Sequence, residues 1–351
     1  MFEVEEPQGR EASKVWLRSS KVWRRQLITY HPTIGWWWIP NLKAMMLSDD
    51  LYLLRTNSIG MRSDREYPLK LPDGRHRIVL LGDSQTAGES VTNRQRFSDL
   101  LEKFYPNLDV MNFGLSGSGT DQQLLIYETL AKSFEADAYI IAPFWSNIAR
   151  NMVDLYVFGR RRGVAWMAKP YFLLEGDNLA LHNTPVPRTG LISDEDATKH
   201  RTLPEPETGD NTGFTLPWEF PDPLRTKLRF ALTRPYSGYE SDESRSWRLM
   251  RAILERFIGE VNGKPVFIVP LPDYAHYSCG VAPTYLARYE KLHDPSIDCI
   301  VVDPLPHFNR LSSEELTKCR SKEAHYSAFG HHVLAEAISD ALERHCPAIL
   351  R

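Results

Sequence analysis

From residue 76 onward, short apolar runs alternate with longer segments of helical character. The runs are rich in β-branched residues, and the first two end at Gly82 and Gly114, as is typical of strands buried on both faces of a parallel sheet. The predicted strands are 77–81, 109–113, 138–144, 265–270 and 299–303. The predicted helices are 94–105, 120–134, 245–261 and 328–344.

This alternation predicts an α/β fold. Strands that alternate with helices form βαβ units, whose right-handed connections place helices on both faces of a parallel sheet. We therefore expect a three-layer α/β/α architecture around five parallel strands. In such sheets the ligand binds beyond the carboxyl ends of the strands, so the residues that directly follow each strand are the candidates for chemistry.

The long segment between the third and fourth strands, residues 150–244, lies outside this pattern. Within it, residues 171–181 predict two short strands about a Gly-Asp-Asn turn, and residues 203–225 are rich in Pro, Gly, Thr and Glu, as is typical of a surface loop. We divide the chain into an N-terminal extension that packs on the core, the core itself, and an insertion near the active site. The boundaries are 1–75 for the extension, 76–149 with 245–351 for the core, and 150–244 for the insertion.

The N-terminal extension contains two aromatic features. Residues 14–28 have apolar residues at helical spacing with Lys and Arg between them. Such a helix can lie on a membrane surface, but we favour a helix that docks on the domain through its tryptophans. The run Trp36-Trp37-Trp38 could stack on sugars, although burial is the commoner fate of clustered tryptophans.

Composition and charge narrow the class of protein. The 351 residues include 42 Lys and Arg against 45 Asp and Glu, for a formal charge of −3, which predicts no general attraction to nucleic acid. No stretch approaches the length of about 18 apolar residues that a membrane span needs, and the first residues have no apolar signal-peptide core. We expect a cytoplasmic protein. Its four scattered cysteines are interpreted as free thiols, with two disulfides as the alternative.

The first strand runs into Gly82-Asp83-Ser84. A serine at a strand–helix turn places its hydroxyl at the ligand edge of the sheet and its N–H where it can stabilise an oxyanion. Alone, such a serine is more often a helix cap than a nucleophile. The blocks that follow change this interpretation.

Four blocks in chain order resemble those of the SGNH/GDSL hydrolases. They are Gly82-Asp83-Ser84, the glycine Gly114 in the stretch 112–122, Asn147 after the third strand, and His325 before the C-terminal helix. The resemblance covers about residues 30–345, and the blocks are specific jointly although each is weak alone. It implies the flavodoxin-like, doubly wound fold of that family.

The resemblance also implies roles for these residues. Ser84 is the expected nucleophile, and His325 is the base that takes its proton and returns it to the leaving alcohol. The N–H groups of Ser84 and Gly114 and the side-chain amide of Asn147 are expected to form a three-donor oxyanion hole.

Two positions depart from the family pattern. Many members have an aspartate three residues before the histidine, where this chain has Lys322; Glu323 is the nearest acid and is our candidate for the third triad member. The alternative is a Ser84–His325 dyad in which a backbone carbonyl, in place of an acid, contacts the histidine. Ile148 stands where relatives often have aspartate, which leaves the donor of Asn147 in place.

Other site types fit less well. His325, His331 and His332 lack an acid or cysteine that would complete a metal site, so we expect no metal and no cofactor, with His331 and His332 as structural residues of the last helix. Arg160-Arg161-Arg162 is interpreted as a solvated turn, with contact to an anionic part of the substrate as the alternative.

The sequence thus predicts a serine esterase or deacetylase that acts on a carboxylic, O-acyl ester of a small molecule or carbohydrate. Two alternatives stay open. The same machinery could pass the acyl group to a hydroxyl acceptor, as an O-acyltransferase. Lys322 and Ile148 also allow a non-catalytic binding protein on the same scaffold.

Overall fold

A computed structural model describes most of the chain. The described residues are 27–49, 51–158, 165–188, 203, 222–233, 237–261 and 263–351. Residues 14–26 of the predicted basic helix, Arg160-Arg161-Arg162 and most of the predicted loop 203–225 lie outside them.

Five parallel strands form the central sheet, as predicted. They are β5 (His76–Gly82), β6 (Leu108–Asn112), β7 (Ala138–Ala142), β12 (Val266–Ile268) and β13 (Cys299–Val301). Their order across the sheet is β13-β12-β7-β5-β6, and every pairing is parallel. This is the flavodoxin-like order, in which the chain reverses direction across the sheet between the first and third strands. The switch point therefore lies between β5 and β7.

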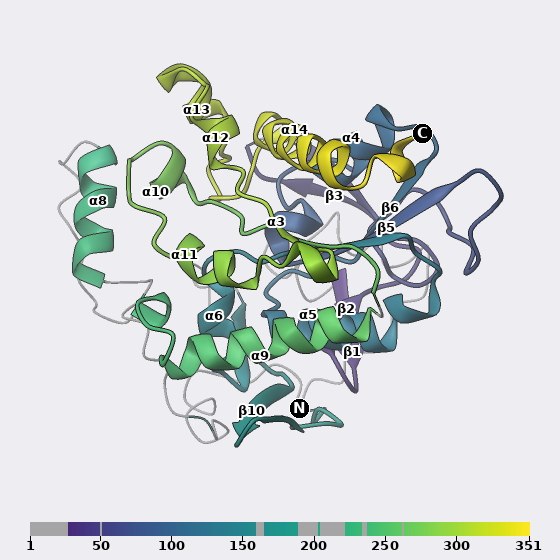
Figure 1. The fold of residues 1–351 in the computed structure, drawn as a ribbon, viewed down its shortest axis with the longest axis horizontal. Coiled ribbons are helices and arrows are strands. Elements are labelled where there is room, and N and C mark those ends of the chain that lie inside the picture. The colour runs from purple at the N-terminus through teal and green to yellow at the C-terminus, as the bar shows by residue number, and fades with distance from the viewer. Residues whose placement is uncertain are drawn as a thin grey trace.

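Helices cover both faces of this sheet (Figure 1). On one face lie α4 (Phe97–Phe104) and α14 (Ala328–His345), and on the other α5 (Thr120–Thr129) and α9 (Arg245–Glu260). These four elements confirm the predicted helices; the predicted 120–134 ends earlier and continues as the 3₁₀ turn Ala131–Ser133. The three-layer α/β/α prediction is confirmed.

Shorter elements fill the connections. The helices are α3 (Ser84–Ala87), α6 (Asn147–Arg150), α8 (Asp222–Thr233), α10 (Tyr274–Tyr277), α11 (Leu286–Tyr289), α12 (Leu305–Phe308) and α13 (Ser313–Lys318). The antiparallel hairpins are β1 (Ile28–His31) with β2 (Gly35–Trp38), β3 (Lys43–Leu47) with β4 (Leu51–Arg55), β8 (Leu155–Phe158) with β9 (Ala165–Ala168), and β10 (Tyr171–Glu175) with β11 (Asn178–His182).

The hairpin β10–β11 confirms the prediction for 171–181. The loop predicted over 203–225 is wrong at its end, because α8 begins at Asp222. Pro223 lies in the first turn of this helix, where the ring's fixed φ suits a helix and the missing N–H costs nothing. The sequence analysis interpreted that proline as a sign of irregular structure.

The tryptophans of β2 attach the N-terminal hairpin to the loop that follows β6. Trp36 is fully buried and Trp38 is 2% exposed, so their predicted burial is confirmed. The indole N–H of Trp36 donates to the carbonyl of Ser116 (3.1 Å), and that of Trp38 donates to the carbonyl of Gly114 (3.0 Å). Because a buried indole N–H needs an acceptor, these bonds fix both the hairpin and the loop after β6.

All four cysteines are free thiols in the structure, and three of them are buried. Burial raises the pKa of Cys299 to about 11. Within the described residues, no helix has both the length and the apolar character needed to cross a bilayer.

His331 joins α4 to α14 in the core. Its ring is fully buried and stacks on Phe97 with the ring centroids 5.7 Å apart. The Nδ1 atom accepts the backbone N–H of Phe97 (3.3 Å), a bond that only the unprotonated nitrogen can make. Burial lowers the pKa of His331 to about 3.

We expect the burial of His331 to make the protein less stable as the pH falls below about 6.5. Histidine in the unfolded chain binds a proton near that pH, whereas folded His331 does so only near pH 3. Stability is therefore present above pH 6.5 and is lost as the pH falls toward 3, by up to about 1.4 kcal/mol per pH unit. The unfolding free energy is measured with urea at pH 7 and at pH 5. The difference between these two values should be about 2 kcal/mol smaller in His331→Phe than in the wild type.

The neighbouring His332 gives the matched control, because its side chain is 46% exposed. His332→Phe should leave the difference between pH 7 and pH 5 close to that of the wild type. If His331→Phe also leaves it unchanged, the buried neutral ring is not the source of the pH dependence.

Candidate active site

Ser84 lies at the carboxyl end of β5, at the switch point of the sheet. β5 ends at Gly82, where a Cβ atom would come within 2.0 Å of Thr86 Oγ1, so the chain can turn this sharply only with glycine. Asp83 caps α3, and Ser84 is the first residue of this one-turn helix. The N–H of Ser84 makes no hydrogen bond within the described chain, as expected for a first helical residue. Ser84 is 8% exposed.

The structure brings His325 to Ser84. The Nε2 atom of His325 lies 3.0 Å from Ser84 Oγ, although the two residues are 241 positions apart in the chain. His325 lies on the turn that leads into α14, after Ala324, whose φ of 65° is in the left-handed region. The distance is that of a hydrogen bond, so the hydroxyl of Ser84 can donate to the imidazole.

Gln85 holds these two segments together, and the sequence analysis missed it. Its Nε2 donates to the carbonyl of Ala324 (3.2 Å), and its Oε1 accepts the backbone N–H of Tyr326 (3.1 Å). Gln85, the residue after Ser84, thus bonds to the chain on both sides of His325. No spacing in the sequence indicates this pair of bonds, because the partners lie on distant segments.

Asp83 is fully buried beneath the site and accepts three hydrogen bonds. Its Oδ1 accepts the N–H of Gln85 (2.9 Å), and its Oδ2 accepts from Asn147 Nδ2 (3.1 Å) and from Arg150 Nη1 (2.7 Å). Burial opposes the charge of Arg150, but Tyr156 and Asp83 outweigh it and raise the pKa of the guanidinium. The carboxylate is therefore neutralised by a cation that the sequence analysis did not identify.

Asn147 takes part in this network through its side-chain amide. The side chain is fully buried, and its Nδ2 faces Asp83 Oδ2 at 3.1 Å and the carbonyl of Ser118 at 3.5 Å. Its Oδ1 accepts the N–H of Phe144 (3.1 Å) and an N–H of Gln123 (3.1 Å). These contacts support the loop after β7, and the role of Asn147 as an oxyanion donor stays a prediction.

Gly114 also differs from the expected arrangement. Its N–H donates to Asn112 Oδ1 (2.9 Å), so this group too is engaged. A Cβ atom at this position would lie 2.4 Å from the backbone nitrogen of Ala87. Glycine is required here because the loop after β6 passes against α3, the helix that carries Ser84.

The same loop contains a second glycine whose N–H makes no bond within the described chain. Gly117 has a φ of 80°, and a Cβ atom there would lie 2.5 Å from the ring of Tyr156. The loop is held to the end of β5, because Leu115 N–H and Ser118 Oγ both donate to the carbonyl of Gly82 (3.0 and 3.3 Å). The unpaired N–H of Gly117 therefore belongs to a loop fixed beside the turn that carries Ser84.

Glu323 makes no hydrogen bond with Nδ1 of His325 in the structure, and the triad role expected for it stays a prediction. Glu323 is exposed, and the Nδ1 atom of His325 is buried with no hydrogen-bond partner in the described chain. Among the residues that the structure describes, the carboxylate closest to the ring is Glu89, whose Oε2 lies 3.5 Å from Nε2. Lys322 donates its backbone N–H to the carboxylate of Asp49 (2.9 and 3.1 Å) and thus anchors the turn before His325.

A second buried ion pair supports the segment after α6. Lys169 and Asp121 are fully buried and bonded to each other, and Lys169 Nζ also donates to the carbonyls of Arg150 (3.0 Å) and Val153 (3.2 Å). Burial lowers the pKa of Lys169 and raises that of Asp121. The hairpin β8–β9 is thereby tied to α5 next to the site.

The remaining histidines have structural contacts. His331 packs in the core, and His332 contacts Glu336 on α14 (3.3 Å). No group of three or more His, Cys, Asp or Glu side chains in the described ranges is arranged to hold a metal ion.

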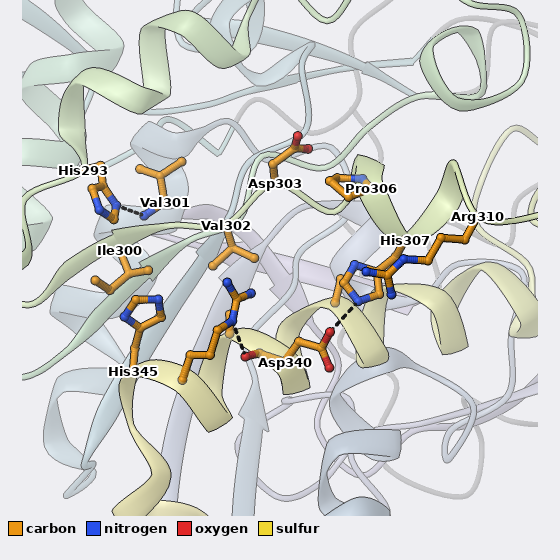
Figure 2. Close-up of a pocket in the computed structure, with 13 residues that line it drawn as sticks. His293, Ile300, Val301, Val302, Asp303, Pro306, His307, Arg310, Asp340 and His345 are labelled. Carbon is orange, nitrogen blue, oxygen red and sulfur yellow. Dashed lines mark hydrogen bonds and ion pairs between the residues drawn. The ribbon is translucent and has the colours of Figure 1, made fainter.

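A hollow of about 640 Å³ lies at the edge of the sheet, beside β13 (Figure 2). His307 and Asp340 both line it and contact each other, with His307 Nε2 2.9 Å from Asp340 Oδ2. None of the residues around Ser84 and His325 lines this hollow. The contact between Ser84 and His325 therefore lies elsewhere, at the carboxyl end of β5.

The chain matches solved structures, but no family model and no curated protein matches it. It is similar to a lipase/acylhydrolase from Enterococcus faecalis, with 14% identity, 77% of this chain and 96% of that chain covered, and a TM-score of 0.39. A member of the lipolytic protein G-D-S-L family from Veillonella parvula gives 12% identity, coverage of 77% and 99%, and a TM-score of 0.39. An α/β hydrolase from the metagenome of Lake Arreo, Spain, gives 13% identity, coverage of 79% of this chain and 96% of that chain, and a TM-score of 0.41.

The position of Asn147 gives a prediction about stability. Asn147→Ala removes one partner of the buried Asp83 carboxylate and leaves the N–H of Phe144 without its acceptor. We expect the unfolding free energy, measured with urea, to fall by about 1–3 kcal/mol. The exposed Asn309→Ala is the control and should change it by less than about 0.5 kcal/mol. If both variants are as stable as the wild type, the network around Asp83 does not depend on Asn147.

Proposed function

We propose that this protein is a serine esterase that hydrolyses a carboxylic, O-acyl ester, with Ser84 as the nucleophile and His325 as the general base. The observation that carries the proposal is the 3.0 Å contact between His325 Nε2 and Ser84 Oγ at the carboxyl end of β5. A serine hydroxyl is a weak nucleophile at neutral pH and needs an adjacent base. Ligands of doubly wound sheets bind at this edge, next to the switch point.

The reaction proceeds in two halves. Ser84 Oγ attacks the carbonyl carbon of the ester while its proton moves to His325 Nε2. The tetrahedral intermediate then expels the alcohol, which takes the proton from His325 and leaves an acyl group on Ser84. In the second half water attacks this acyl group, with His325 again accepting and returning the proton, and the carboxylic acid is released.

The developing oxyanion needs hydrogen-bond donors fixed in advance. The N–H of Ser84 is one, because it has no partner within the described chain. We assign the second to Gly117, whose N–H is likewise unpaired among the described residues, in a loop bonded to the carbonyl of Gly82. Since α3 is a single turn, its dipole adds little, and these two N–H groups carry the stabilisation.

Labelling with a fluorophosphonate probe tests the nucleophile and the base. The wild type should react at one serine, Ser84, identified by mass spectrometry, and Ser84→Ala should not react. His325→Ala should slow the reaction by about 10²–10⁴, the usual contribution of a general base. Both variants should keep the wild-type circular dichroism spectrum. Labelling of Ser84→Ala at the wild-type rate would rule out the proposed nucleophile.

The buried Ser98 gives a matched control, because Ser98→Ala removes a hydroxyl that bonds Asn112 (2.8 Å) and lies outside the Ser84–His325 contact. This variant should be labelled as the wild type is. Equal loss of labelling in Ser98→Ala would show that the loss reflects general damage.

Product analysis separates hydrolysis from acyl transfer. With p-nitrophenyl acetate we expect p-nitrophenol and free acetate in equal amounts, because water deacylates Ser84. Adding a sugar with free hydroxyl groups should not divert the acetate. If acetylated sugar accumulates at the expense of free acetate, the protein is an acyltransferase on the same machinery.

A further inference from the structure

A buried carboxylate, Glu89, lies beside the imidazole of His325. The residue is 4% exposed, and its Oε2 is 3.5 Å from His325 Nε2. This is the nitrogen that contacts Ser84 Oγ at 3.0 Å. One nitrogen of the ring thus faces both the nucleophile and a carboxylate, whereas Nδ1 has no hydrogen-bond partner in the described chain.

The position of Glu89 is fixed by the turn that carries the nucleophile. Its backbone N–H donates to the carbonyl of Ser84 (3.1 Å), and the preceding Gly88 ends α3 with a left-handed φ of 78°. Arg62, 1% exposed, donates to the carbonyls of Ala87 (2.7 Å) and Gly88 (2.5 Å). The bonds from the guanidinium thus fix the backbone of the turn from which the side chain of Glu89 extends.

The surrounding charges favour an ionised Glu89. Arg62 and Arg150 both interact electrostatically with it. Tyr52 also faces it, and burial, with the charge of Glu89, raises the pKa of that phenol. Two cationic neighbours favour the charged form of a buried carboxylate.

Resting on the function proposed above, we propose that Glu89 is the carboxylate that positions His325 and stabilises its protonated form during attack by Ser84. When the proton of Ser84 Oγ moves to Nε2, the imidazolium that forms lies against the carboxylate of Glu89. Glu89 takes no proton, which passes from Nε2 to the leaving alcohol. The acid that assists the base is thus on the same turn as the nucleophile.

Other charged groups near His325 do not replace this carboxylate. From α14, His331 faces the ring but is neutral, since burial lowers its pKa to about 3. On the histidine's own segment, Lys322 and Glu323 are exposed, so solvent screens their charges. From α6, Arg150 is bonded to Asp83. Glu89 is the buried anion in contact with the imidazole.

The pH dependence of fluorophosphonate labelling tests this role. The rate constant for labelling at Ser84 is measured from pH 5 to pH 10 for the wild type and for Glu89→Gln, which keeps the size of the side chain and removes its charge. Protonated His325 loses its anionic neighbour in the variant. We therefore expect the acidic limb of the profile to move to lower pH by about one unit or more, and the plateau rate to fall at least about tenfold.

Glu323→Gln is the matched control, since it makes the same chemical change two residues before His325. It should leave the limb in place and the plateau within about twofold of the wild type. Glu89→Asp, which retracts the carboxylate by one methylene group, should shift the limb in the same direction as Glu89→Gln by a smaller amount, and it provides the test if the glutamine variant does not fold.

Three results would overturn the inference, and they are distinguishable from one another. If the wild type is labelled at Ser84 and the Glu89 variants have its pH profile, the proposed esterase stands and Glu89 has no role in it. If the wild type is not labelled at Ser84, the proposed function fails and the role of Glu89 fails with it. If the acidic limb of the pH profile shifts in Glu323→Gln but not in Glu89→Gln, Glu323 and not Glu89 is the carboxylate that assists His325.

Discussion

The arrangement around Ser84 depends on one buried charge, the carboxylate of Asp83. An ionised carboxylate removed from water is costly unless cations and hydrogen bonds replace its hydration. Here Gln85, Asn147 and Arg150 supply three donors. These donors come from α3 and α6, which follow the neighbouring strands β5 and β7. The need to satisfy Asp83 therefore fixes the two strand ends against each other, and Ser84 is the residue that follows it.

The rest of the site is assembled from distant segments by polar contacts of the same kind. Gln85 holds the turn of His325, the tryptophans of β2 hold the loop after β6, and Lys169 holds the segment after α6. Each contact pairs a buried donor with a backbone carbonyl that would otherwise have no partner. The apolar core places the strand ends at one edge, and these bonds determine which side chains meet there.

The fold could be predicted from the sequence because the signal is local. Apolar, β-branched runs that end at Gly82 and Gly114 identify buried strands, and their alternation with helices leaves one sheet architecture. The pairing of Ser84 with His325 was also accessible, through four blocks in chain order. The hydrogen-bond partners of these site residues could not be predicted in this way. Whether the N–H of Gly114 or the amide of Asn147 is engaged depends on bonds to Asn112 and Asp83 that only the folded backbone determines. Pattern reasoning gave His325 the acid closest in sequence, Glu323, while the acid closest in space is Glu89.

The indole bonds of β2 have a consequence for any shortened form of the chain. A fragment that began at β5 would keep every strand of the central sheet, together with Ser84 and His325. It would nevertheless leave the carbonyls of Gly114 and Ser116 without the donors Trp38 and Trp36, and it would expose the apolar surface that these rings cover. The minimal folded unit is therefore larger than the parallel sheet and its helices, and its N-terminal limit lies ahead of the first hairpin.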